Sequence, residues 1–182
     1  GSTLLCASIS DLTAQLHATL WAQPRPTLIT SGTLAIGKDF SRFKEEAGLT
    51  RNPRTEESVS PSPYDYRKNC LLYVPAMPPR HHDADYFEKL ASEIRDLLIA
   101  AHGHALVLFT SYAAMSAVKD RLKHPSLPFS LFTMGRNAHH TMAQFKASPG
   151  SVLLATGAAW EGFDFPGDCV SLLVIPRLPF QY

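Results

Sequence analysis

Residues 151–167 read SVLLATGAAWEGFDFPG and set the expectation for the whole chain. The apolar run at 152–155 is short and bounded, which is typical of a buried parallel strand. Thr156 and Gly157 follow, then a polar, acidic turn, and a second apolar run begins at 170–175. A glycine-bearing acidic loop between two buried strands is where α/β proteins place their chemistry, and a plain solvated connection is the alternative.

Length and composition indicate a globular α/β protein with a real core. The chain has 182 residues and 45% hydrophobic residues, which is ordinary for such a domain. A formal net charge of +1 gives no bulk attraction for nucleic acid, so such a contact needs a local site. The three cysteines lie far apart and predict free thiols in a reducing cytoplasm, with no zinc site. No apolar run has the length of a membrane span.

Strand and helix patterns alternate along the chain. Strands are expected at 27–30, 69–74, 105–109, 129–132, 152–155 and 170–175, and helices at 8–21, 38–47, 84–101, 113–122 and 138–146. Residues 50–66 are rich in Arg, Glu, Ser and Pro and predict an exposed loop. Alternation of this kind predicts a mainly parallel sheet with helices on both faces.

Three of the expected strands end in similar loops. These loops read TSGT at 30–33, TSY at 110–112 and TG at 156–157. Because ligands bind at the carboxyl ends of parallel strands, we expect Thr30, Thr110 and Thr156 to share one rim. Hydroxyls and exposed backbone N–H groups at such a rim suit a phosphate backbone.

The same segments resemble helicase motifs in an unusual order. LLATGAAWEGFDFPGD at 153–168, followed by LLVIPRLPF at 172–180, resembles motif V and the next strand of DinG-type helicases, superfamily 2 DNA helicases related to the XPD group. LFTSY at 108–112 is similar to motif IV, and TSGTL at 30–34 is similar to motif III with Gly32 replacing an alanine. SPYDY at 62–66 and the segment after it also match, so the resemblance runs from about residue 10 to the end.

The resemblance implies a RecA-like, P-loop NTPase type three-layer α/β fold and the second motor domain of an ATP-dependent DNA helicase. Residues 1–182 would form this single domain and stop before motif VI, as a piece of a longer cytoplasmic DNA-repair protein. The chain has no G-x-x-x-x-G-K-[ST] loop and no Asp-Glu-Ala-His-like box. ATP and Mg²⁺ would therefore also need the first motor domain, which holds the Mg²⁺ ligands, and the fragment alone would hydrolyse no ATP.

The resemblance also assigns roles by position, with single-stranded DNA and the first motor domain of the parent chain as partners. The residues implied to bind nucleotide are Glu161, Gly162, Asp164 and, just past the last strand, Arg177. The residues implied to bind DNA are Thr110, Ser111, Tyr112, Thr156, Gly157 and Trp160. Ser31 and Thr33 would couple the two domains. No catalytic residue and no metal site is expected within this fragment.

Several alternatives stay open. Trp160 suits a core aromatic as well as a platform for a base. The sequence His81-His82-Asp83-x-Asp85 fits a solvated loop before a helix better than a metal cluster, because its spacing matches no known ligand set. Lys119, Arg121 and Lys123 fit a solvated helix face better than a basic stripe. For the whole chain, a non-catalytic α/β module that binds a nucleotide or a protein is the second functional hypothesis.

Overall fold

The structure of the chain is a computed structural model that describes residues 11–50, 52–76, 85–135 and 137–179. It divides into two compact units, Gly1–Leu72 and Tyr73–Tyr182, each of which is described by itself. The expectation of one domain over 1–182 stays a prediction. None of the helices in the described ranges is long and apolar enough to cross a membrane.

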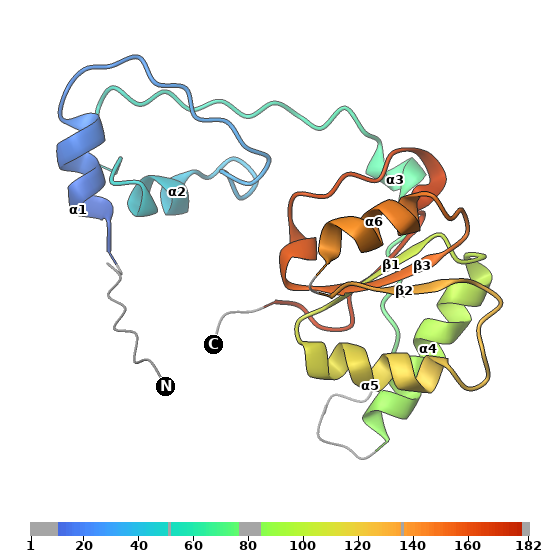
Figure 1. Ribbon diagram of the computed structural model, residues 1–182. Coiled ribbons are helices and arrows are strands. Elements are labelled where there is room, and N and C mark those ends of the chain that lie inside the picture. Colours follow the sequence, from blue (N-terminus) through green and yellow to red (C-terminus); the bar gives the residue numbers. More distant parts are fainter. Residues whose placement is uncertain (1–10, 51, 77–84, 136, 180–182) are drawn as a thin grey trace, which may run out of the picture. The chain divides into compact units, whose positions relative to one another are not determined.

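The first unit consists of short helices joined by long connections (Figure 1). Helix α1, Thr13–Leu16, continues as the π-helix η1, His17–Trp21, and is followed by α2, Ser41–Glu46, and α3, Tyr66–Asn69. The Trp21 indole Nε1 donates a hydrogen bond to the Ala47 carbonyl at 2.7 Å, which joins the end of η1 to the end of α2. Most of the segment 52–66 is exposed, as predicted.

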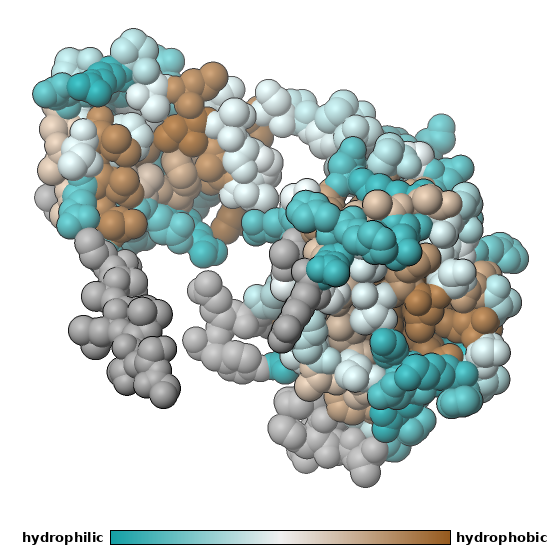
Figure 2. Space-filling view, in the orientation of Figure 1, coloured by the Kyte–Doolittle hydropathy of each residue, from teal (hydrophilic) through white to brown (hydrophobic). Residues whose placement is uncertain are grey.

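Two predicted strands, at 27–30 and 69–74, are wrong. Neither segment pairs with a strand in the described part of the chain. Their side chains are strongly exposed, with Leu28 at 91% and Leu71 at 92%. Figure 2 shows apolar side chains at the surface of the first unit. The physical reason is that a β-branched, apolar run becomes a strand only when a neighbouring strand accepts its backbone hydrogen bonds.

The second unit is built on a four-stranded, all-parallel sheet, which confirms the predicted α/β class. The strands are β1, Ala105–Phe109; β2, Leu131–Thr133; β3, Val152–Thr156; and β4, Leu172–Val174. Their order is β2-β3-β1-β4. All residues of β1 and β3 are buried, as expected for central strands covered on both faces.

Helices cover both faces of this sheet and make a three-layer, RecA-like arrangement (Figure 1). On one face lie α4, Tyr86–Ala100, and α5, Tyr112–Leu122, and on the other lies α6, Ala138–Lys146. Helix α4 turns Leu90, Ile94 and Leu98 inward at helical spacing. The alternating side chains of β1 and β3 divide between the two core clusters, one on each face.

The strand order brings three carboxyl ends together. The chain leaves β1 through α5 to reach the edge strand β2, returns through α6 to β3, and then adds β4 on the far side of β1. Phe109 pairs with Thr156 and Val107 with Val174. The ends of β3, β1 and β4 are therefore neighbours, and a change of direction of this kind is where open α/β sheets hold ligands.

The opposite end of the sheet is held by close backbone contact. Gly103, between α4 and β1, has φ +78, and a Cβ there would lie 1.9 Å from the Gly150 carbonyl oxygen. The His104 ring Nδ1 lies 2.6 Å from the Asp168 carbonyl oxygen. The connections that lead into β1, β3 and β4 thus touch one another, which aligns the starts of the three strands.

Candidate nucleic-acid interface

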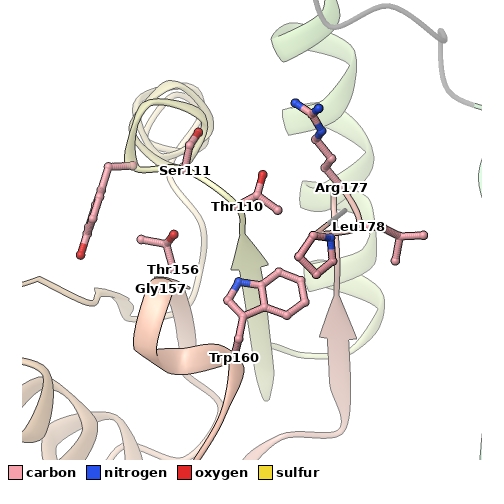
Figure 3. A pocket seen from close by; sticks show the side chains of 9 residues that line it. Thr110, Ser111, Thr156, Gly157, Trp160, Arg177 and Leu178 are labelled. Carbon is pink, nitrogen blue, oxygen red and sulfur yellow. The ribbon is translucent and has the colours of Figure 1, made fainter. Parts of the chain in front are cut away.

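A hollow of about 620 Å³ lies at the carboxyl ends of β1, β3 and β4 (Figure 3). Its lining residues are Thr110, Ser111, Tyr112, Thr156, Gly157, Trp160, Arg177, Leu178 and Pro179. It therefore gathers all six residues that the resemblance assigns to DNA. These residues come from two segments of the chain, and the nearest two of them across the segments, Tyr112 and Thr156, are 44 positions apart. Arg177, expected near the nucleotide, lines the same hollow from the end of β4.

The loop after β1 presents hydroxyls and the start of a helix. Thr110 is exposed, and Ser111 is the N-cap of α5, where its Oγ accepts a hydrogen bond from the Ala114 N–H at 3.2 Å. Serine is a preferred residue at this position because it satisfies a backbone donor that the helix leaves unpaired. Tyr112, the first residue of α5, is 64% exposed. Ser111 thus has a structural task in addition to any contact with a ligand.

The end of β3 presents a hydroxyl without an internal partner. Thr156 is only 5% exposed but lines the hollow. Within the described part of the chain its hydroxyl forms no hydrogen bond. Gly157 follows with φ +61 and open space where a Cβ would stand. Because no buried side-chain oxygen or nitrogen among the described residues lacks a partner, this hydroxyl oxygen is accessible from the hollow. A ligand there can bind it.

Trp160 is anchored in the wall of the hollow. It ends the 3-10 helix η2, Gly157–Trp160, and its indole Nε1 donates to the Phe109 carbonyl at 3.0 Å. The side chain is partly buried against the core cluster that α6 covers. Figure 3 shows its ring between the Thr156 corner and the segment that carries Arg177. The structure therefore gives Trp160 a packing role, and base stacking stays a prediction.

The acidic turn lies outside the lining of the hollow. Glu161, Gly162 and Asp164 are exposed, and Gly162 has φ +81. Among the residues that the structure describes, no group of three or more His, Cys, Asp or Glu side chains could hold a metal ion. Exposed carboxylates without companions suit hydrogen bonds to hydroxyls such as those of a ribose, and a nucleotide role for this turn stays a prediction.

The residues predicted to couple domains lie in the first unit. Ser31 and Thr33 are exposed in a turn where their hydroxyls lie 3.2 Å apart. Because the two units are described separately, this coupling and the expected rim shared by Thr30 with Thr110 and Thr156 stay predictions.

Other candidate groups carry no site chemistry in the structure. His81, His82 and Asp83 lie outside the described residues. Arg121 in α5 pairs with Glu88 at 2.7 Å, and Lys123, the C-cap of α5, pairs with Asp120 at 2.8 Å. These ion pairs favour the solvated helix face over a basic stripe.

Sequence reasoning missed three contributors to the hollow. Leu178 and Pro179 line it, and their only signal is their place just after the last strand. The Phe109 carbonyl, which holds the Trp160 ring, has no signal at all, because every residue carries such a group. The distribution of side chains around the hollow required the strand order to be known.

Comparison with known proteins agrees with this geometry. Residues 94–182, which include the whole sheet and the hollow, match the family model described as the helicase C-terminal domain. The chain carries a helicase C-terminal domain. This match favours the motor hypothesis over the alternative of a non-catalytic binding module.

The helicase C-terminal domain also has curated relatives along most of the chain. The chain is 29% identical over 174 residues to "ATP-dependent DNA helicase YoaA" of Escherichia coli, which covers 95% of the chain and 26% of the relative. It is 34% identical over 173 residues to "ATP-dependent helicase DinG" of Mycobacterium tuberculosis, and this match covers 92% of the chain and 25% of the relative. It is 31% identical over 170 residues to "3'-5' exonuclease DinG" of Bacillus subtilis, and this match covers 88% of the chain and 18% of the relative.

These relatives confirm the resemblance to DinG-type helicases. The chain spans about a quarter of the length of the first two. The activity of a whole helicase therefore reaches this chain only as a proposal.

Proposed function

We propose that this chain supplies the second motor domain of an ATP-dependent DNA helicase of the cytoplasm that acts in DNA repair. In this proposal the turn with Glu161, Gly162 and Asp164 forms half of an ATP site shared with the first motor domain. The hollow at the strand ends forms part of the track for single-stranded DNA. The phosphate-binding loop and the Mg²⁺ ligands belong to the first motor domain, and Ser31 and Thr33 couple the two domains.

The observation that carries the proposal is the gathering of six predicted DNA residues in one hollow. Hydroxyls from Thr110 and Thr156 suit phosphate oxygens, and the exposed ring of Tyr112 and the wall of Trp160 suit the faces of bases. Contacts of this kind read the backbone and the stacking of bases without selecting a sequence. A motor that moves along DNA requires such indifference to sequence.

Movement along the strand follows from the division of labour between the domains. ATP binding closes the two motor domains on each other, and hydrolysis allows them to separate. Each cycle would shift the contact that the loops after β1 and β3 make with the backbone. The residues of this chain contribute the moving contact, while transition-state stabilisation of phosphoryl transfer depends on groups of both domains.

The sharpest test of the DNA track is Thr156→Val. Valine keeps the volume and β-branching of the side chain and removes only the hydroxyl, which has no hydrogen-bond partner within the described residues. We expect the affinity for fluorescent oligothymidylate, measured by anisotropy, to fall roughly tenfold, the loss of one hydrogen bond to a charged group at about 1.5 kcal/mol.

Thr133→Val is the matched control, because Thr133 also ends a strand, β2, but does not line the hollow. We expect this variant to bind as the unaltered chain does. Equal affinity of all three proteins for the oligonucleotide, with unchanged urea unfolding, would contradict the proposed track.

A further inference from the structure

We propose that Arg177 neutralises a phosphate of the single-stranded DNA backbone, although its position in the chain predicts contact with the nucleotide. This inference rests on the proposed function and deepens it, because it identifies the charged group of the DNA track. Two observations carry it: the charge of the hollow and the place of Arg177 relative to the hydroxyls.

The hollow has a simple electrostatic character. Of its nine lining residues, Arg177 alone carries a formal charge, and none of them has a carboxylate. The acidic residues of the neighbouring turn, Glu161 and Asp164, do not line it. A side chain with a positive charge thus lines the hollow together with hydroxyls, an amphipathic ring and apolar groups. Such a surface attracts a single negative charge.

The two possible sources of phosphate differ in the groups that proteins use to bind them. A nucleoside triphosphate arrives with a divalent cation and several negative charges, which proteins meet with carboxylate, lysine and glycine-loop groups together. A phosphodiester of DNA carries one charge and no metal, and one arginine with nearby hydroxyls matches it. One arginine among hydroxyls therefore suits a phosphodiester of the strand. Because the proposal places the Mg²⁺ ligands in the first motor domain, the position of Arg177 among the residues assigned to DNA has to decide between the strand and the triphosphate.

The geometry points the same way. Arg177 follows β4, Thr110 follows β1, and Thr156 ends β3, so the three side chains come from neighbouring strand ends. In Figure 3 the guanidinium of Arg177 and the hydroxyl of Thr110 project to the same side of the hollow. Thr156 adds a hydroxyl that has no hydrogen-bond partner in the described residues and is accessible from the hollow. Arginine and hydroxyl donors on one side suit the two free oxygens of a phosphodiester.

The test is the salt dependence of DNA binding. For single strands, each neutralised phosphate contributes about −0.7 to the slope of log affinity against log salt concentration. We expect Arg177→Ala to weaken binding of fluorescent oligothymidylate and to make the slope less steep by about 0.7. Between 50 and 200 mM KCl the affinity of the variant should therefore fall by roughly 2.6-fold less than that of the unaltered chain.

Lys146→Ala serves as the charge-matched control. Lys146 is an exposed cation of the same unit, in α6, and lies outside the lining of the hollow. The Lys146→Ala substitution removes the same charge from the protein as Arg177→Ala. If the slope of log affinity against log salt concentration changed equally in both variants, it would reflect net charge alone, and the inference would be overturned. Circular dichroism and urea unfolding should show a similar fold and stability for both, and they are needed as controls because the Lys146 Nζ lies 5.5 Å from the Phe165 ring centroid.

The outcomes also separate this inference from the proposed function. If the chain binds DNA, loses affinity in Thr156→Val and keeps its full slope in Arg177→Ala, the track stands and the role of Arg177 is overturned. If the chain does not bind oligothymidylate at all, both are overturned. If Arg177→Ala weakens binding of a fluorescent ATP analogue with Mg²⁺ and leaves DNA binding unchanged, Arg177 belongs to the nucleotide site.

Discussion

Ser111 has two tasks at the start of α5, and they make opposite demands on the side chain. As the N-cap it must accept a hydrogen bond from the Ala114 N–H, and as a lining residue of the hollow it faces the proposed strand. The first task tolerates a negative charge, since Asp caps helices about as well as Ser and suits the helix dipole. The second task does not, because the ligand is an anion.

We therefore expect Ser111→Asp to fold as stably as the unaltered chain while it binds oligothymidylate more weakly, by at least about fivefold. Two unit charges about 4 Å apart repel by roughly 1–4 kcal/mol between bulk water and a protein surface. Urea unfolding and fluorescence anisotropy measure the two effects separately.

Ser111→Asn is the neutral counterpart, because Asn is also a preferred cap. It should preserve both stability and DNA affinity. Equal affinities of the Asp and Asn variants would show that no anion approaches this corner.

At the scale of residues, motif order assigned expected roles to side chains but could not predict how each side chain is held. Trp160 illustrates the difference. Its two predicted roles, core aromatic and base platform, could not be separated in the sequence. The bond to the Phe109 carbonyl comes from the packing of β1 beside η2, which no local pattern encodes.

At the scale of elements, the joint at Gly103 holds the sheet in register. The connection from α4 to β1 crosses the connection from α6 to β3 with backbone against backbone, at Gly103 and Gly150. Only a residue without a Cβ permits this approach, and the positive φ adds a second requirement for glycine.

We expect Gly103→Ala to lower the free energy of unfolding by roughly 2–5 kcal/mol, the sum of the left-handed backbone and the overpacking costs. Urea unfolding followed by circular dichroism measures the change. Gly135→Ala should be close to neutral, because a Cβ there meets nothing within 4 Å and no positive φ opposes it. Similar stabilities of the two variants would refute the tight joint.

The wrongly predicted strands also belong to this scale. Residues 27–30 and 69–74 have the same apolar, β-branched character as β1 and β3. The difference is that β1 and β3 are hydrogen-bonded to neighbouring strands, whereas these segments have no strand partner among the described residues. Strand formation is a property of at least two segments, so a single segment predicts it poorly.

At the scale of the whole molecule, the proposal makes the chain one of two motor domains that together form the ATP site. The phosphate-binding loop and the Asp-Glu-Ala-His-like box are absent from the sequence. We therefore expect the purified 182-residue chain to show no ATP hydrolysis above background with Mg²⁺ and single-stranded DNA, measured by phosphate release. Robust Mg²⁺-dependent hydrolysis would contradict this division of labour.

The acidic turn makes its contribution only where both domains are present. In a longer protein that contains this chain and a first motor domain, we expect Asp164→Ala to lower the rate of ATP turnover roughly tenfold, which corresponds to the loss of about 1.4 kcal/mol of transition-state stabilisation. The fold should be unaffected, because Asp164 is exposed. Steady-state phosphate release with saturating DNA measures the rate. Asp168→Ala, an exposed carboxylate in the same connection, is the control that should retain activity, and equal rates for the two variants would exclude the role.

The sequence by itself determined the class of the fold, the helices of the second unit, the four strands of its sheet and the family. These features depend on local periodicity and on short motifs, which neighbouring residues along the chain specify. Only the tertiary structure decided the strand order, the lack of strand pairing at 27–30 and 69–74 among the described residues, and the place of Arg177 in one hollow with Thr110 and Thr156. Those features depend on which segments become neighbours in the sheet. Packing and backbone pairing between residues that lie far apart in the chain determine these neighbours.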